Sequence, residues 1–251
     1  MGPVGEPAAA AEAVEISRWL APTGPIATLL GVLLYGINWC AMRGLFRLHV
    51  EGTQNIPETR AFVIAPNHAS YLDPLVIAAA LPLARLRRMY WAGSVTLLFG
   101  TTLRRLFSRV AHVFPVDERR PDDAIAAAVQ ALDAGHSAVW FPEGWRSPDG
   151  ALQRFLPGIG QVLLRSGAPA IPTFVAGTFK AWPRGRHIPM LAPVTITFGH
   201  AERLDSLRTA GAGETEEERI ANALRDRVIA LGGSLCAASL RVPEVLPNGP
   251  L

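Results

Sequence analysis

Two short polar stretches contain the residues of this chain that are best suited to chemistry. They are Asn67-His68-Ala69-Ser70-Tyr71-Leu72-Asp73-Pro74 and Phe141-Pro142-Glu143-Gly144-Trp145-Arg146-Ser147. In the first stretch, four residues separate His68 from Asp73. A histidine held by a carboxylate is a general base that needs no metal ion and can take a proton from an attacking hydroxyl. The pair therefore predicts a proton-transfer site.

Both stretches follow short apolar runs, at residues 61–65 and 137–140, that are typical of buried strands. The carboxyl ends of parallel strands form the crevice in which open α/β sheets bind ligands. We therefore expect the two stretches to share one site. His68 and Asp73 would form one wall, and Glu143 and Arg146 the other.

The first stretch also fits a purely structural interpretation. Asp73 precedes Pro74 and an apolar run at residues 75–81, and both a carboxylate and a proline are common at helix starts. Asp73 would then only cap a helix, and His68 would only satisfy its loop. The first stretch alone leaves both interpretations open.

Short strands alternate with helices after residue 48, which predicts an α/β fold with a largely parallel sheet flanked by helices. The strands are expected near residues 48–51, 61–65, 88–91, 112–116, 137–141, 170–175 and 194–198, and the helices near 74–81, 94–107, 122–134, 159–166 and 214–230. A chain of 251 residues is long enough for one such domain with an appended segment. We expect a disordered leader at 1–18, a membrane-associated segment at 19–48, a catalytic domain at 49–232 and a peripheral tail at 233–251.

The N-terminal segment has no charged residue from Trp19 to Met42, and a helix is expected from about Pro25. Its uncharged part would be about 26 Å long, just under the ~30 Å hydrocarbon thickness of a bilayer. A tilted or interfacial membrane helix and a buried core helix both fit this length. Arg43 and Arg47 follow it, so the positive-inside rule predicts a catalytic domain on the cytoplasmic face of the cell membrane.

Composition agrees with a lipid-facing protein. Hydrophobic residues make up 49% of the chain and charged residues 18%, with a mean hydropathy of +0.22. This excess of apolar residues is expected in a membrane segment or another exposed apolar surface. The two cysteines, Cys40 and Cys236, are too few for a disulfide framework and are consistent with a reducing compartment.

Arginine is concentrated between residues 85 and 120, where Asp117 and Glu118 are the only acidic residues. Nucleic acid is not the expected partner, because no groove-reading motif or alternation of aromatic and basic residues accompanies the charge. The surface of an anionic membrane fits this charge better. A solvated arginine-rich face is the alternative.

The pattern Asn67-His68-x-Ser70-x-x-Asp73 with Phe141-Pro142-Glu143-Gly144-x-Arg146-Ser147 resembles the paired signature motifs of the glycerolipid (lysophosphatidate-type, 1-acyl-sn-glycerol-3-phosphate) acyltransferase family. Residues 112–117 resemble the second block of this family, and residues 170–175 the fourth. The second block departs from the family at His112, where glycine is usual, and at Glu118, where arginine is usual; Arg119 and Arg120 are displaced. The motif at residues 141–147 is the third block of the family, and in it Trp145 replaces a threonine and can alter which head group fits.

This resemblance implies transfer of an acyl group from acyl-CoA or acyl carrier protein to the free hydroxyl of a membrane lysophospholipid. The foremost acceptor would be 1-acylglycerol-3-phosphate, giving phosphatidate, and neither a cofactor nor a metal ion is implied. His68 would be the base and Asp73 would hold its tautomer. Glu143 and Gly144 would orient the glycerol, and Arg146 would bind the phosphate. Ser147 and Arg119 are further expected substrate-binding residues, and the motifs would be supported by Asn67, Ser70, Phe141, Pro142, Ile171 and Pro172.

Other functions remain open on the same residues. The acceptor can be a different lyso-lipid, the same pair can activate water in a lipid hydrolase, or the fold can serve a non-catalytic lipid-binding protein. An intact His68 and Asp73 pair disfavours the last function, because a binding protein needs neither residue. Sequence does not give the oligomeric state.

Overall fold

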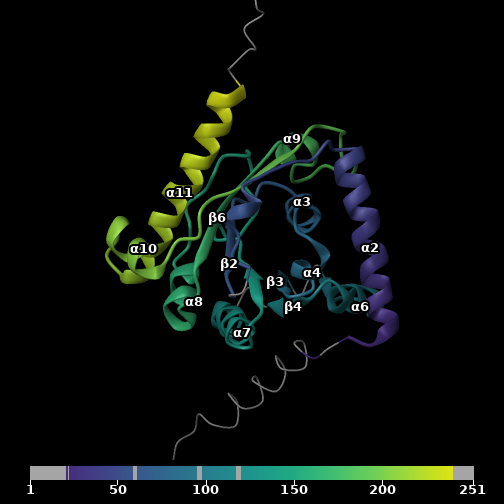
Figure 1. Cartoon of the computed structure of the whole chain (residues 1–251), viewed down its shortest axis with the longest axis horizontal. Helices are drawn as coiled ribbons and strands as arrows, with labels where there is room; N and C mark the ends of the chain where they lie inside the picture. Colours follow the sequence, from purple (N-terminus) through teal and green to yellow (C-terminus); the bar gives the residue numbers. More distant parts are fainter. Residues whose placement is uncertain (1–20, 22, 59–60, 95–97, 117–119, 240–251) are drawn as a thin grey trace, which may run out of the picture.

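The computed structural model describes residues 21, 23–58, 61–94, 98–116 and 120–239 (Figure 1). Its centre is a seven-stranded sheet with the order β1-β7-β6-β2-β5-β3-β4. The strands are β1 His49–Glu51, β2 Val63–Pro66, β3 Met89–Ser94, β4 Val113–Val116, β5 Ser137–Val139, β6 Ala170–Ala176 and β7 Thr195–Phe198. All seven correspond to the strands expected from the apolar runs.

Five of the strands, β6, β2, β5, β3 and β4, run parallel to one another. β7 is antiparallel to β6, and β1 is parallel to β7, so one edge of the sheet is reversed. The prediction of a largely parallel sheet is confirmed. β2 lies between β5 and β6 in the sheet. After β5 the chain crosses to the other side of β2, where β6 lies. A ligand crevice is expected at such a switch point, outside the carboxyl end of β2.

Helices cover both faces of the sheet (Figure 1). One face carries α7, α8, α10 and α11, and the other carries α2, α3 and α6. The helices are α2 Pro25–Gly44, α3 Asp73–Ala80, α4 Leu83–Leu86, α6 Thr102–Val110, α7 Pro121–Asp133, α8 Gly158–Ser166, α9 Thr178–Ala181, α10 Leu204–Ala210 and α11 Glu216–Ser239, with a 3-10 turn, η1, at Thr53–Asn55. The central strands are buried on both faces, which explains their continuous apolar runs.

Two expected helices have different bounds in the structure. Within the helix expected at 94–107, Ser94 belongs to β3, residues 95–97 lie outside the described residues, and α6 begins at Thr102, where the side chain of Thr101 accepts the backbone N–H of Arg104. The last helix continues to Ser239 rather than ending near 230. Gly232 does not stop this helix; a Cβ there would lie 2.8 Å from the ring of Phe174, so glycine permits close packing instead. The expected tail therefore begins inside α11.

Helix α2 begins at Pro25, as expected, and rests on α3 through two side chains. The hydroxyl of Tyr35 donates to the carbonyl of Leu81, and the amide of Asn38 donates to the carbonyl of Leu75. The other side of the helix is open, with large apolar side chains exposed at Ile26, Leu29, Leu33 and Ile37. The interpretation of α2 as a buried core helix is therefore wrong. It is long and apolar enough to cross a membrane. The expected leader, residues 1–18, lies outside the described residues.

Candidate active site

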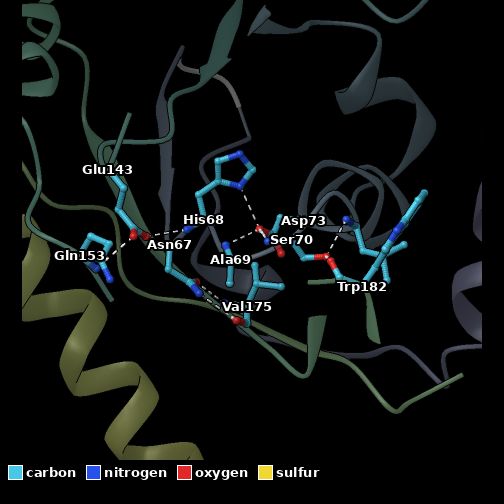
Figure 2. Close-up of polar contacts among 10 residues, drawn as sticks. Asn67, His68, Ala69, Ser70, Asp73, Glu143, Gln153, Val175 and Trp182 are labelled. Carbon is cyan, nitrogen blue, oxygen red and sulfur yellow. Dashed lines mark hydrogen bonds and ion pairs between the residues drawn. The ribbon is translucent and has the colours of Figure 1, made fainter. Parts of the chain in front are cut away.

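The side chain of His68, in the loop after β2, meets that of Asp73, the first residue of α3 (Figure 2). Nδ1 of His68 lies 2.9 Å from Oδ2 of Asp73. The same oxygen accepts the backbone N–H groups of Ala69 and Ser70, each at 2.7 Å. Asp73 is fully buried, so its carboxylate is fixed, and it orients the imidazole with Nδ1–H as the donor. Nε2 then remains as the basic nitrogen, and it points away from Asp73.

Asp73 does not cap helix α3. The capping position belongs to Leu72, and no side chain bonds there to the free helical N–H groups. Asp73 instead occupies the first turn, and its carboxylate is turned back onto the loop. The capping interpretation is therefore wrong. The positive end of the helix dipole still favours a negative charge at this place.

Phe141 fixes the imidazole from a second direction. Its ring is stacked on that of His68, with 4.0 Å between the ring centroids and 28° between the planes. Phe141 follows β5, the strand that pairs with β2. The two polar stretches therefore meet at neighbouring strand ends, as the sequence predicts.

The second stretch also holds the backbone of His68. Oε1 of Glu143 accepts the backbone N–H of His68 at 2.6 Å. The backbone N–H of Ser147 donates to the backbone carbonyl of His68 at 2.8 Å. Oε2 of Glu143 accepts the backbone N–H of Gln153 at 3.0 Å. The backbone N–H and carbonyl of His68 are thus both bonded to the loop that follows β5, and Figure 2 shows the contact with Glu143.

These contacts indicate a positioning role for Glu143. Its side chain is buried, and burial raises its pKa to about 6, against the lowering effect of the N–H groups of His68 and Gln153. Each carboxylate oxygen already accepts one backbone hydrogen bond. A direct contact between Glu143 and the acceptor stays a prediction.

Gly144 and Ser147 shape the turn that follows Glu143. Gly144 has a φ of 76°, a left-handed backbone region that favours glycine, and a Cβ on it would also press on the side chain of Leu156. Ser147 is buried; its hydroxyl donates to Asp149 at 3.0 Å and accepts the N–H of Gly150 at 2.9 Å. In the structure Ser147 stabilises the loop, and its expected contact with substrate stays a prediction.

The guanidinium of Arg146 lies over an aromatic ring from the first stretch. Its Cζ atom is 3.5 Å from the centroid of the Tyr71 ring. Nη1 is buried and has no hydrogen-bond partner among the described residues. A guanidinium held over a ring, with one donor that no described residue uses, can bind an anion. Trp145 beside it is 58% exposed, so its indole is available to a substrate.

The second stretch lines a cleft of about 420 Å³. Its lining residues are Glu143, Trp145, Arg146, Pro148, Gln153, Arg154, Leu156 and Arg184. Arg154 and Arg184 line the same cleft as Arg146, and the sequence did not predict either of them. Neither belongs to a motif, and Arg184 lies about forty residues along the chain, so only the fold brings it to this cleft. Tyr71 was also missed, although an aromatic residue inside the first motif was a visible signal.

Asn67 and Ser70 support the catalytic loop. The side-chain amide of Asn67 pairs with the backbone of Val175, accepting its N–H at 2.7 Å and donating to its carbonyl at 3.0 Å. It thereby extends the β2 and β6 pairing by one residue. Ser70 donates its hydroxyl to the carbonyl of Trp182 at 2.7 Å and accepts the N–H of Leu72. The supporting motif residues Pro142, Ile171 and Pro172 are buried.

The second block behaves differently from the two polar stretches. His112 has a φ of 55°, a backbone region that favours glycine, and its ring stacks on Tyr90 at 5.0 Å. Burial lowers the pKa of His112. Arg120 forms an ion pair with Asp123 at the start of α7, with 2.9 Å between Nε and Oδ2. Arg119 lies outside the described residues, so its expected role stays a prediction.

Comparison with known protein families matches the part of the chain that contains the site. The family model described as Acyltransferase matches residues 47–176, just over half of the chain, and this range includes both polar stretches. The chain belongs to the acyltransferase family. No group of three His, Cys, Asp or Glu side chains among the described residues is arranged to hold a metal ion, and the expectation of a metal-free enzyme stays a prediction.

Curated relatives of this acyltransferase are named 1-acyl-sn-glycerol-3-phosphate acyltransferases. One from Limnanthes alba is 27% identical over 70% of this chain and 58% of its own length. One from Borreliella burgdorferi is 25% identical over 73% of this chain and 70% of its own length. The first of these matches thus spans less than two thirds of the relative.

A solved structure has the same fold. The crystal structure of the 1-acyl-sn-glycerophosphate (LPA) acyltransferase PlsC from Thermotoga maritima superimposes with a TM-score of 0.67. The match covers 92% of this acyltransferase and 90% of that chain at 21% identity. The expected fold class is therefore confirmed.

Proposed function

We propose that this acyltransferase moves an acyl group from acyl-CoA or acyl carrier protein to the free hydroxyl of a lysophospholipid, foremost 1-acylglycerol-3-phosphate. The observation that supports this most is the pairing of His68 with the buried Asp73, next to a loop that presents Arg146. The relatives' names agree with this substrate.

The chemistry needs only a general base and an activated thioester. Nε2 of His68 takes the proton from the acceptor hydroxyl while the oxygen attacks the thioester carbonyl. The tetrahedral intermediate then collapses, the carbon–sulfur bond breaks, and His68 returns its proton to the leaving sulfur. Asp73 stabilises the imidazolium that exists between these steps. The protein forms no covalent bond to the acyl group.

The acceptor phosphate is assigned to Arg146. Its guanidinium can offer two parallel N–H groups to two phosphate oxygens, a geometry that stacking on Tyr71 helps to fix. Arg154 and Arg184 line the same cleft and add positive charge to it. Trp145 stands beside this site and is expected to influence which head group is accepted.

A membrane-associated enzyme fits this substrate, because lysophospholipids reside in bilayers. Helix α2 exposes Ile26, Leu29, Leu33 and Ile37 along the side that does not contact α3. Arg43 lies in the last turn of this helix. These features support attachment to the cytoplasmic face of the membrane, with α2 lying in the interface or spanning it.

One assay tests this function directly. Purified protein in detergent is given labelled acyl-CoA, or labelled acyl carrier protein, with and without lysophosphatidate. Labelled phosphatidate formed only with the acceptor supports the proposal. Labelled free fatty acid without phosphatidate would show a hydrolase, and the absence of both products would favour a lipid-binding protein. A panel of lyso-lipids in the same assay then ranks the acceptors.

A further inference from the structure

The segment between α9 and β7, residues 183–193, exposes three large apolar side chains in close succession. Ile188 is 77% exposed, Met190 44% and Leu191 64%. We call residues 183–193 the α9–β7 segment. Isolated apolar residues are common on protein surfaces, but three large apolar side chains exposed within four positions concentrate apolar area in one short segment. Such a surface is typical of contact with a membrane or another protein.

The α9–β7 segment is held in place by backbone and side-chain hydrogen bonds. The N–H of Met190 donates to the carbonyl of Ala181 at 2.7 Å, and the indole N–H of Trp182 donates to the carbonyl of Arg186 at 2.8 Å. At its far end, Pro193 lies so near to Gly177 that a Cβ on Gly177 would be 2.2 Å from its carbonyl oxygen. The apolar side chains therefore project from a fixed frame.

This segment is connected to the catalytic loop. The hydroxyl of Ser70 donates to the carbonyl of Trp182, which directly precedes the segment, and the rings of Tyr71 and Trp182 lie 5.5 Å apart. Arg184, the second residue of the segment, lines the same cleft as Arg146. The α9–β7 segment thus begins at the border of the cleft proposed for the acceptor.

The α9–β7 segment also lies beside the C-terminal end of α2 (Figure 1). Directly after the segment, the N–H of Val194 donates to the carbonyl of Phe46 at 3.0 Å. Leu45, which follows α2, is 54% exposed. The α9–β7 segment therefore adjoins the C-terminal end of α2, whose outer side is also apolar and exposed.

Cationic side chains accompany the apolar ones. Arg184 and Arg186 are exposed, and the α9–β7 segment contains no acidic residue. Apolar side chains next to arginines match the two layers of an anionic membrane surface, where acyl chains lie below charged phosphates. An acidic protein would use the arginines but would leave the three aliphatic side chains less well matched.

We propose that the α9–β7 segment is a second membrane contact, in which Ile188, Met190 and Leu191 enter the interface of an anionic bilayer. Together with α2 it would turn the cleft at Arg146 toward the lipid surface, so that a lysophospholipid reaches the site without leaving the membrane. This inference rests on the proposed function, because it assumes an acceptor in the membrane.

Vesicle binding of the full chain tests the contact. The double variant Ile188→Ser with Leu191→Ser is compared with Ile229→Ser, a matched control on α11, where Ile229 is 44% exposed on the opposite face of the sheet. Vesicles contain phosphatidylcholine and phosphatidylglycerol. We expect the double variant to bind at least about tenfold more weakly, because two aliphatic side chains no longer leave water. The control should bind like the parent protein.

Depth of insertion gives a readout that does not depend on turnover. An environment-sensitive fluorophore is attached at Leu191→Cys or at Ile229→Cys, in a chain that also carries Cys40→Ser and Cys236→Ser. On addition of vesicles, the emission should shift to the blue at position 191 and stay unchanged at position 229. Circular dichroism of each variant checks that the fold is retained, which is expected at Ile188, Leu191, Ile229 and Cys40 because their side chains are exposed.

The outcomes separate this inference from the proposed function. No blue shift at position 191, or parental vesicle affinity of the double variant, would overturn the membrane contact even in an active enzyme. A double variant that binds vesicles normally but loses activity with acyl carrier protein alone would show a protein-docking surface instead. A parent protein without acyltransferase activity would refute the proposed function and leave the vesicle measurements valid.

Discussion

The carboxylate of Glu143 accepts the backbone N–H of His68 at 2.6 Å, which joins the two motifs of the site directly. The bond crosses from the loop after β5 to the loop after β2, between strands that are neighbours in the sheet. Ser147 donates to the carbonyl of the same histidine. The base is therefore positioned by the motif that also presents Arg146.

Replacing Glu143 by glutamine tests this positioning role. The amide keeps one acceptor oxygen but turns an NH₂ group toward the other backbone N–H, so one hydrogen bond is lost. A hydrogen bond to a charged group contributes about 1.5–3 kcal/mol, so kcat should fall roughly ten- to a hundredfold while the acceptor KM changes little. Steady-state kinetics with varied lysophosphatidate measure both. A rise confined to the acceptor KM would instead favour direct contact with the glycerol.

Glu143 should also make stability depend on pH. Its pKa is raised from 4.5 to about 6 in the folded protein, chiefly by burial, so the folded state favours the protonated form. Its contribution to stability is fully present below pH 4.5 and is lost as the pH rises through about 6.

The comparison with Glu143→Gln isolates this contribution from all other titrations. Relative to that variant, the free energy of unfolding of the parent should fall by at most about 2 kcal/mol as the pH rises from 4.5 to about 6. Urea unfolding at several pH values measures the difference. A difference that is flat or grows with pH would show that Glu143 is ionised as readily when folded as when unfolded.

Arg146→Lys separates phosphate binding from simple charge. Lysine keeps the positive charge but loses the planar fork and the stacking on Tyr71. The acceptor KM should rise about ten- to a hundredfold, the value of one charge-assisted hydrogen bond, with the acyl-donor KM nearly unchanged. Arg120→Lys, at the ion pair with Asp123, is the control and should show no such defect. A defect limited to the acyl donor would move Arg146 to the other substrate.

The outward side of α2 should dominate membrane binding. Ile26, Leu33 and Ile37 are exposed, so replacing all three by asparagine leaves the packing of Met42 against the domain intact. Membrane affinity should fall at least about a hundredfold, because three large aliphatic side chains no longer leave water. Sedimentation with vesicles measures this loss. Unchanged sedimentation of the triple variant would show that the main attachment lies elsewhere.

The sequence predicts the elements of the site better than its contacts. Apolar runs before Asn67 and Phe141 place both motifs at strand ends. These runs are recognisable because β2 and β5 are buried on both faces, so their sequences are almost continuously apolar. Local chemistry misleads at Asp73, where a proline and a carboxylate indicate a helix cap, yet the carboxylate bonds backward to Ala69. The contribution of Arg184 depends on tertiary packing, which no local pattern contains.

Turnover of His68→Ala with acyl-CoA and lysophosphatidate tests the central claim most directly. His68 lies in a loop and keeps 16% of its side chain exposed, so the variant should fold and bind vesicles like the parent protein. Loss of a positioned general base should lower kcat about 10²–10⁴-fold. A variant that forms phosphatidate within a few-fold of the parental rate would contradict the account, because the proton would then be taken by another group.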